Sequence, residues 1–265
     1  MKFISANRLL AAIMAGTMAL SFTACGEKSK NDAGSEKFVV GFDAAFPPYG
    51  YQDESGDYVG FDLDLAAEVC KRNDWELVKQ PIDWNAKDME LNSGTISCIW
   101  NGFTMTGRED EYAWTAPYVD NSQVFVVKAD SGIEKFDDLS GKSVAVQTDS
   151  SAEDALEDEA NSALKSSFKE LVVVGDYNTA FMNLDSGAAD AVAMDIGVAK
   201  YQIESRGNGY TMLPDILSVE QYAVGFALDN TELRDKVDST LNDMRKDGTF
   251  EKIAEEWGLS DSIIK

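Results

Sequence analysis

The sequence predicts an α/β protein of two lobes, each a βαβ-based sheet with flanking helices, joined by two hinge strands. Three observations support this prediction. Short apolar runs alternate with segments of helical periodicity, which is the pattern of βαβ units and largely parallel sheets. One layout of helix end, turn and buried strand occurs twice, about 90 residues apart. The last segment, from Tyr222, has helical patterns but no full βαβ unit. The simplest arrangement is that it packs onto the first lobe.

The first lobe begins with an apolar strand at residues 38–42. A polar hairpin around Gly56 follows. A helix starts at Phe61, where apolar residues recur at helical spacing and Asp62 is well placed as the N-cap. A second strand covers residues 75–78. Strand, helix and strand together predict one βαβ unit.

The repeated layout covers residues 91–101 and 184–194. Each copy has a helix end, a Ser-Gly C-cap and a short buried strand. The first strand ends in Asn101-Gly102 and the second in Asp195. Ligands of open α/β sheets bind beyond the carboxyl ends of strands, so both ends are candidate site positions. Chance similarity of two common αβ connections is the alternative.

The second lobe has strands at residues 143–147 and 171–174 and a helical segment at 152–159. Two more helical patterns, at 232–246 and 249–257, close the chain. We therefore assign residues 37–120 and 222–265 to lobe 1, and residues 121–221, with the hinge crossings, to lobe 2. Two crossing strands make a hinge, and two hinged lobes can close on a ligand.

The composition excludes several classes of function. The 265 residues carry 23 Lys and Arg against 47 Asp and Glu, a formal net charge of −24, with no histidine. So acidic a chain is a poor partner for nucleic acid or anionic lipid. Without histidine there is no Ser-His-Asp triad and no imidazole metal site. Three cysteines cannot form a structural zinc site, so we expect no metal and no cofactor.

The first 24 residues have the features of a signal peptide. Lys2 and Arg8 give a basic start, and residues 9–22 form an apolar run too short to span a bilayer. Residues 25–36 are polar and suit a flexible tether. The segment Phe22-Thr-Ala-Cys25 resembles the lipobox of bacterial lipoproteins, which implies lipidation of Cys25. The alternative is a plain secretory signal cleaved near Ala24.

The other two cysteines leave two interpretations open. Cys70 falls in a helical pattern and Cys98 in an apolar strand pattern. Both are either buried free thiols or, outside the cell, a disulfide.

Two motifs identify a family. They are Gly60-Phe-Asp-Leu-Asp64 and Gly102-x-Thr-x-Thr106 followed by Arg108. With these, the chain from Phe38 to Trp257 resembles the bacterial extracellular solute-binding proteins of family 3, which deliver polar amino acids to ABC importers. The resemblance implies a type II periplasmic-binding-protein-like fold, ligand capture between the lobes, an importer permease as partner and an extracytoplasmic location. We expect a monomer that touches the membrane only through its lipid anchor.

The resemblance assigns the ligand's carboxylate to four residues. A desolvated carboxylate must be paired and hydrogen-bonded, and arginine can hold both of its oxygens. Arg108 matches the family's carboxylate-binding arginine, although the usual loop is one residue longer and has the order Thr-x-Glu-Arg. Thr104 in the same loop, and Ser150 and Ser151 at a helix start, match the other carboxylate contacts. For both serines, an ordinary helix N-cap is the alternative.

The ligand's ammonium group needs acceptors. Asp195 matches the family's amino-group acid, and the carbonyl of Gly102 is its companion. A turn residue at the strand end is the alternative for Asp195.

The side-chain pocket is the least specific part of the prediction. Positions that line it in the family correspond to Asp43, Phe46, Trp84, Gln147 and Met194. An acidic Asp43 favours a ligand side chain with hydrogen-bond donors and disfavours glutamate or aspartate. The sequence therefore favours a neutral polar or a cationic amino acid.

Other functional classes remain as alternatives. Asp43 and Asp195 could act as an acid/base pair of a cleft enzyme, but the sequence adds no nucleophile or metal cluster, so we expect no enzyme activity. An amino-acid-sensing receptor domain would need a later membrane span, which the sequence lacks. A surface adhesin would bind no amino acid.

Overall fold

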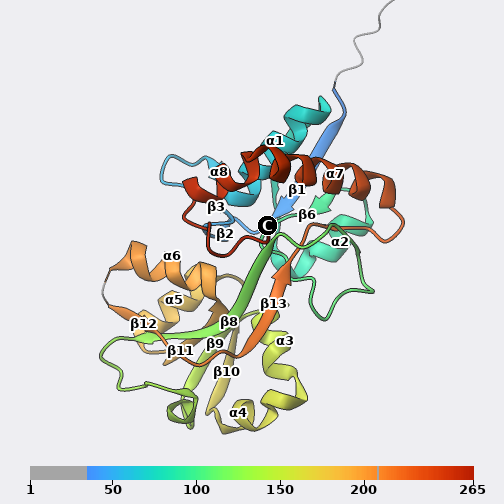
Figure 1. Cartoon of the computed structure of the whole chain (residues 1–265). Coiled ribbons are helices and arrows are strands. Elements are labelled where there is room, and N and C mark those ends of the chain that lie inside the picture. Colours follow the sequence, from blue (N-terminus) through green and yellow to red (C-terminus); the bar gives the residue numbers. More distant parts are fainter. Residues whose placement is uncertain (1–34, 208) are drawn as a thin grey trace, which may run out of the picture. The chain divides into compact units, whose positions relative to one another are not determined.

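Two β-sheets organise residues 35–207 and 209–265, the part of the chain that this computed structural model describes (Figure 1). The first sheet has the order β5-β1-β6-β14-β7. Its strands are β5 (Glu76–Pro81), β1 (Lys37–Phe42), β6 (Cys98–Ile99), β14 (Gly225–Phe226) and β7 (Ala113–Trp114). β1 runs parallel to β5 and β6, whereas β14 is antiparallel to β6 and β7.

The second sheet has the order β10-β9-β11-β8-β12, with β13 also paired to β8. Its strands are β10 (Glu170–Val174), β9 (Ser143–Gln147), β11 (Ala191–Asp195), β8 (Val119–Lys128), β12 (Tyr210–Met212) and β13 (Ser218–Tyr222). β10, β9 and β11 are parallel, but β8 is antiparallel to all its partners. The prediction of largely parallel sheets therefore holds only for the βαβ part. Of the two crossing strands, β8 runs against β10, β9 and β11, whereas β13, being antiparallel to β8, runs in the same direction as β11.

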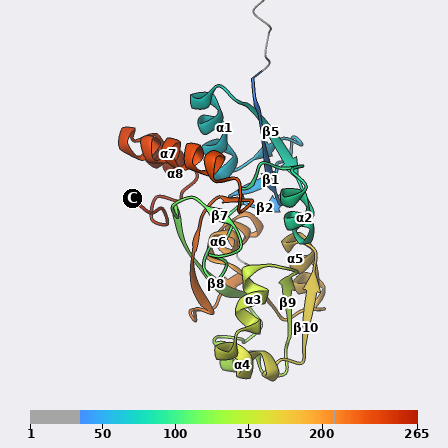
Figure 2. The same ribbon diagram turned by 90° about the vertical axis from the view of Figure 1, so that its right-hand side faces the viewer.

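Helices cover both sheets (Figures 1 and 2). α7 (Thr231–Asp247) and α8 (Thr249–Glu256) pack on α1 (Phe61–Asn73) at the first sheet. The remaining helices are α2 (Lys87–Asn92), α3 (Ser151–Glu157), α4 (Ser162–Ser167), α5 (Tyr177–Ser186) and α6 (Ile196–Arg206), with the short 3-10 helices Trp84–Ala86, Phe136–Leu139 and Glu159–Asn161. α1, α3, α7 and α8 match the segments that the periodicity predicts, and α2 and α5 lie at the two helix ends of the repeated layout. α4 and α6 were not predicted.

The chain crosses between the sheets along β8 and β13, which pair with each other. Asn121 lies opposite Glu220, and Val119 opposite Tyr222. After β13 the chain returns to the first sheet through β14. This pairing supports the lobe division proposed above, with residues 121–221 as lobe 2.

The small sheet beside the cleft holds β2 (Ala45–Phe46), β3 (Gly50–Gln52) and β4 (Tyr58–Val59). β3 and β4 form the predicted hairpin, and Gly56 takes a φ of 89° in its turn. The repeated layout is also confirmed, since Gly94 and Gly187 both take a left-handed φ before β6 and β11.

Asp62 is not the N-cap of α1, so that prediction is wrong. Gly60 occupies the N-cap, where a side-chain Cβ would lie 2.2 Å from the carbonyl oxygen of Tyr49. Asp62 lies in the first turn and is completely buried. Its carboxylate accepts hydrogen bonds from the Gly102 N–H at 2.5 Å and from the Tyr118 hydroxyl at 2.8 Å. The Asp62 carboxylate thus holds the loop at Gly102, and Gly60 is the N-cap of α1.

Cys70 and Cys98 are buried free thiols in the core. The predicted signal peptide, Cys25 and all but the last two residues of the tether lie outside the described residues. Within the described part, no helix has the length and apolar character needed to cross a bilayer.

Candidate functional site

A closed cavity lies where the two sheets face each other. On the side of the first sheet its walls come from the ends of β1 and β6, from β2 and from the 3-10 helix Trp84–Ala86, and on the other side from the ends of β9 and β11 and the start of α3. Ten residues line it: Asp43, Phe46, Trp84, Asn101, Gly102, Thr104, Gln147, Ser150, Ser151 and Asp195. Its free volume is about 10 Å³, barely enough for one water molecule. An amino acid can enter only if the lobes open and these side chains rearrange.

The structure brings together nine of the eleven cleft residues that the sequence predicts. They come from segments distant in the chain, because the carboxyl ends of strands in both sheets converge at this cavity. Arg108 and Met194 are the two that do not line it. Asn101 lines the cavity although it was predicted only as a strand end.

Met194 is fully buried in the core between the sheet and its helices. Successive side chains of a strand point to opposite faces, so Met194 and Asp195 cannot both face the cavity. In this structure Asp195 faces it.

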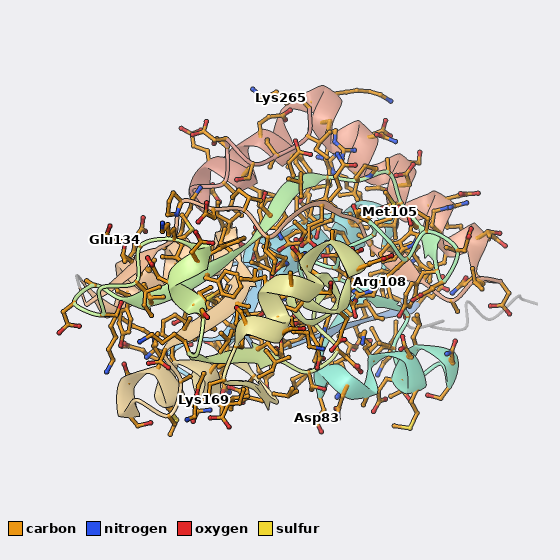
Figure 3. The ribbon with its side chains drawn as sticks, turned by 90° about the horizontal axis from the view of Figure 1, so that it is seen from below. Asp83, Met105, Arg108, Glu134, Lys169 and Lys265 are labelled. Carbon is orange, nitrogen blue, oxygen red and sulfur yellow. The ribbon has the colours of Figure 1, made fainter. Side chains whose placement is uncertain are left out.

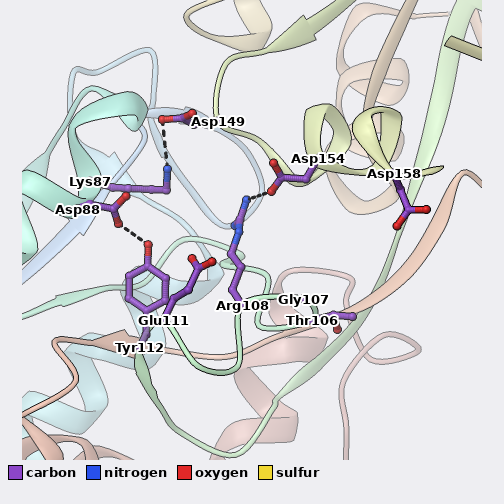
Figure 4. Close-up of a pocket in the computed structure, with 10 residues that line it drawn as sticks. All are labelled: Lys87, Asp88, Thr106, Gly107, Arg108, Glu111, Tyr112, Asp149, Asp154 and Asp158. Carbon is purple, nitrogen blue, oxygen red and sulfur yellow. Dashed lines mark hydrogen bonds and ion pairs between the residues drawn. The ribbon is translucent and has the colours of Figure 1, made fainter. Parts of the chain in front are cut away.

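Arg108 lies in a neighbouring cavity of about 460 Å³ (Figure 4; the residue is also marked in Figure 3). Its guanidinium donates to the Asp154 carboxylate of α3 at 2.5 Å and lies 5.5 Å from the centre of the Phe103 ring. In turn, Phe103 packs edge-on against Trp84, which lines the closed cavity. Arg108 is therefore connected to the cavity through the rings of Phe103 and Trp84.

The side-chain end of the cavity is acidic. Asp43 is buried and accepts hydrogen bonds from the Ala45 N–H at 2.8 Å and from the Gln147 amide at 2.7 Å. Burial raises the pKa of Asp43 to about 6, and the nearby charges of Asp176 and Asp83 add to the rise. Because Gln147 belongs to the opposite lobe, its amide shows where a donor from a ligand could bind.

The opposite end is lined by hydroxyls. Ser150 accepts from the Glu153 N–H at 3.2 Å and is the N-cap of α3, as the alternative for this residue predicts, yet it also lines the cavity. Thr104 is buried, and Ser151 is the first residue of α3. None of the ten lining residues is a lysine or arginine.

Asp195 forms a buried network with the hinge strands. Asn121 of β8 donates through its amide to Asp195 at 2.7 Å and to Glu220 of β13 at 2.6 Å. Gln123 donates to the same two carboxylates, at 2.7 Å each. Burial raises the pKa of Asp195, and it raises the pKa of Glu220 to about 7 with help from the charge of Asp195.

Four further interactions join the lobes around the cavity. They are the Gln147–Asp43 hydrogen bond, the Arg108–Asp154 ion pair, the 3.6 Å ion pair of Lys87 with Asp149, and the hydrogen bond of the Trp84 indole to the Asp149 carbonyl at 3.1 Å. Asp149 has a left-handed φ of 54°, which turns the chain from β9 into α3 and brings its carbonyl to Trp84. These contacts define the structure as a closed form.

The sequence did not assign a site role to Asp62, Asn121, Gln123 or Glu220. For three of them, the strand pattern of the sequence could have indicated a shared position. Asn121 and Gln123 are two residues apart in a strand and must share a face, and Glu220 lies on the strand expected to cross beside them. For Asp62 the periodicity gave only a helix start.

A two-lobed α/β fold with a closed interlobe cavity defines a class of binding protein. The family model of "Bacterial extracellular solute-binding proteins, family 3" matches residues 38–260. The chain belongs to this family, and the predicted fold class is confirmed.

Individual relatives carry more specific names. The chain is 28% identical to the arginine-binding extracellular protein ArtP of Bacillus subtilis over 264 residues, 95% of this chain and 98% of that protein. A solved ABC uptake transporter substrate-binding protein from Streptococcus pneumoniae with bound histidine is similar with a TM-score of 0.82 and 35% identity, over 86% of this chain and 95% of that chain. An ancestral amino-acid-binding protein, described as a precursor of cyclohexadienyl dehydratase, has a TM-score of 0.75 and 28% identity, over 83% and 95% of the two chains.

Proposed function

We propose that this protein captures a polar amino acid between its lobes and delivers it to an ABC importer. The observation that supports this most is the composition of the closed cavity. Carboxylates lie at two places, Asp43 and Asp195, and hydroxyls of Thr104, Ser150 and Ser151 lie at a third. A polar amino acid has matching groups: a side-chain donor, an ammonium and a carboxylate.

The ligand's side chain is neutral polar or cationic. Asp43 holds the Gln147 amide now, and an amide, guanidinium or ammonium of a ligand would replace that donor. A second cavity of about 650 Å³ shares Asp43 and Trp84 with the closed one and adds Asp83, Glu90 and Asp176 to its walls. Negative charge on this side favours cations and disfavours an acidic ligand.

The ligand's carboxylate would be held by the hydroxyls and by Arg108. For this the guanidinium must leave Asp154 and turn past Phe103 towards the cavity. Asp154 is an exposed carboxylate, so exchanging it for a desolvated ligand carboxylate gives the arginine a stronger partner. Closure would then follow from ligand charges that are satisfied only when the lobes meet.

A thermal-shift panel of the twenty amino acids tests the proposal. A ligand that binds only the folded protein at 100 times its Kd adds about 2.7 kcal/mol of stability, which raises Tm. We expect a concentration-dependent rise with a few polar amino acids, and none with glutamate or aspartate.

Asp195→Asn should abolish that rise. The control is Asp137→Asn, which removes the same charge from a side chain that is 88% exposed on the 3-10 helix Phe136–Leu139. A panel without any rise in wild-type Tm would contradict the proposed function.

An enzyme remains the second candidate. Asp43 and Asp195 line the same cavity, and one similar structure is named as the precursor of a dehydratase. Mass spectrometry of the amino acid released from the protein after long incubation separates the two functions, because a binding protein returns its ligand unchanged.

Family membership supports an extracellular location. We propose that the signal peptide at residues 1–24 exports the chain, that lipid on Cys25 anchors it outside the cytoplasm, and that a monomer docks on an importer permease. Mass spectrometry of the membrane-extracted protein would detect the lipid.

A further inference from the structure

The carboxylates of Asp195 and Glu220 form a buried pair at the hinge. Both accept from the same two amide nitrogens, those of Asn121 and Gln123, so the accepting oxygens lie within about 5 Å of each other. The Tyr222 hydroxyl also donates to Asp195 at 2.5 Å, and the Thr104 hydroxyl to Glu220 at 2.9 Å. Glu220 is only 5% exposed.

All four donors to this pair are neutral. The cations beside the cleft, Lys87 and Arg108, form their ion pairs with Asp149 and Asp154 instead. Two carboxylates this close in a buried site without a cation repel each other when both are charged, so the pair retains one proton below neutral pH.

The network also has more acceptors than donors. The amide oxygens of Asn121 and Gln123 are buried without a hydrogen-bond donor among the described residues. The Tyr177 hydroxyl is buried near the charges of Asp195, Glu220 and Asp43. Within the part of the chain that the structure describes, it has no hydrogen-bond partner of normal geometry, although Ser150 lies beside it. A group that brings positive charge and several N–H donors matches these needs.

We propose that Glu220 joins Asp195 in a two-carboxylate site for the ligand's ammonium group, and that the ammonium displaces the proton shared by the pair. This inference rests on the proposed function. The ammonium enters with its charge of +1, the shared O–H bond breaks, and the proton leaves to solvent. The charge of the pair changes from −1 to −2, so the loaded site has a net charge of −1.

The titratable groups that face the pair carry no positive charge that could replace the ammonium. They are Tyr49 from the turn before β3, Tyr177 from α5 and Tyr222 from β13, with Asp43 and Asp62 farther away. Burial raises the pKa of each of the three tyrosines well above its usual value, so all stay neutral. With the pKa of Glu220 near 7, the ligand-free pair loses its proton as the pH rises through neutrality.

Isothermal titration calorimetry with L-arginine and L-glutamine, in phosphate and in buffers of larger ionisation enthalpy, measures the number of protons released on binding. We expect release of close to one proton per amino acid at about pH 6, falling towards zero at about pH 8, with affinity rising about tenfold over that range. Analogues without the α-amino group, 5-guanidinovalerate and glutaramate, should bind weakly and release close to one proton fewer than arginine and glutamine respectively, since a guanidinium can still displace a proton from Asp43, whose pKa is about 6. This comparison needs no variant.

With L-glutamine, whose side chain is neutral, Glu220→Gln should bind more weakly at pH 8 and release no proton at either pH. Asp120→Asn removes an exposed carboxylate of β8 and should keep the wild-type release. Tight binding of arginine or glutamine without proton release, or with equal release by the deaminated analogue, overturns the ammonium site alone. Failure of all twenty amino acids to bind overturns the proposed function and this inference with it.

Discussion

At the scale of single residues, Asp43 shows how burial prepares a carboxyl group for recognition. With its pKa near 6, it is mostly ionised at neutral pH but has little water around it. Hydrogen bonds to a charged group in such a place contribute about 1.5–3 kcal/mol, more than those to a neutral one. We therefore expect Asp43 to distinguish ligands by the charge of their side chains.

Asp43→Asn should weaken L-arginine binding by roughly 10- to 100-fold, because the charge-assisted pair is lost. L-Glutamine binding should change much less, since asparagine still offers an acceptor to its amide. Titration calorimetry of both amino acids on both proteins measures the change in preference. Equal losses for the two ligands would place Asp43 outside the side-chain pocket.

At the scale of elements, the loop after β6 depends on Gly102. Its φ is 56°, and a Cβ there would lie 2.9 Å from ring carbons of both Phe46 and Tyr222. The N–H of Gly102 is held by Asp62 from α1. A helix terminus thus fixes the loop whose carbonyl is predicted to accept from the ligand.

Gly102→Ala should lower the free energy of unfolding by about 2–4 kcal/mol, from backbone strain and overpacking together. Gly94→Ala is the matched control, because Gly94 has a φ of 75° but open space around the added methyl. It should cost only the strain, about 1 kcal/mol. Urea unfolding measures both, and equal costs would show that the contacts with Phe46 and Tyr222 do not matter.

At the scale of the whole molecule, Arg108 has two possible partners across the cleft. In the closed form it pairs with Asp154, and in the loaded form we propose that it pairs with the ligand. The two roles predict opposite effects of removing Asp154. As a competitor, Asp154 weakens ligand binding; as part of a latch, it strengthens closure.

We expect Arg108→Ala to weaken amino-acid binding at least 100-fold and Asp154→Asn to strengthen it about threefold. Arg206→Ala is the control, since Arg206 also stacks on a phenylalanine and pairs with an aspartate, but on α6. If Arg108→Ala and Asp154→Asn lose similar ligand affinity, and the double variant binds no more weakly than either, the ion pair acts instead as a latch that holds the lobes closed.

Much of the fold could be predicted because it depends on patterns of residues that are close together in the sequence. The alternation of strands and helices, the repeated Ser-Gly turn and the hairpin at Gly56 all depend on residues close together in the chain. The prediction failed at Asp62, where a local rule favoured capping, because a buried contact with Gly102, 40 residues away, outweighs one cap hydrogen bond.

By itself, then, the sequence determined most of the helices and strands and which strand ends meet, and its resemblance to a family indicated most of the residues that line the cavity. The tertiary structure alone decided which side chains pair there. In it Met194 is buried in the core and Arg108 forms an ion pair with Asp154. Glu220 and Asp195 share hydrogen-bond donors on the hinge strand β8. The physical reason is that periodicity encodes which face of an element is buried, whereas the partner of a buried charge is chosen by the packing of distant segments: Thr104 and Glu220 are 116 residues apart and share a hydrogen bond.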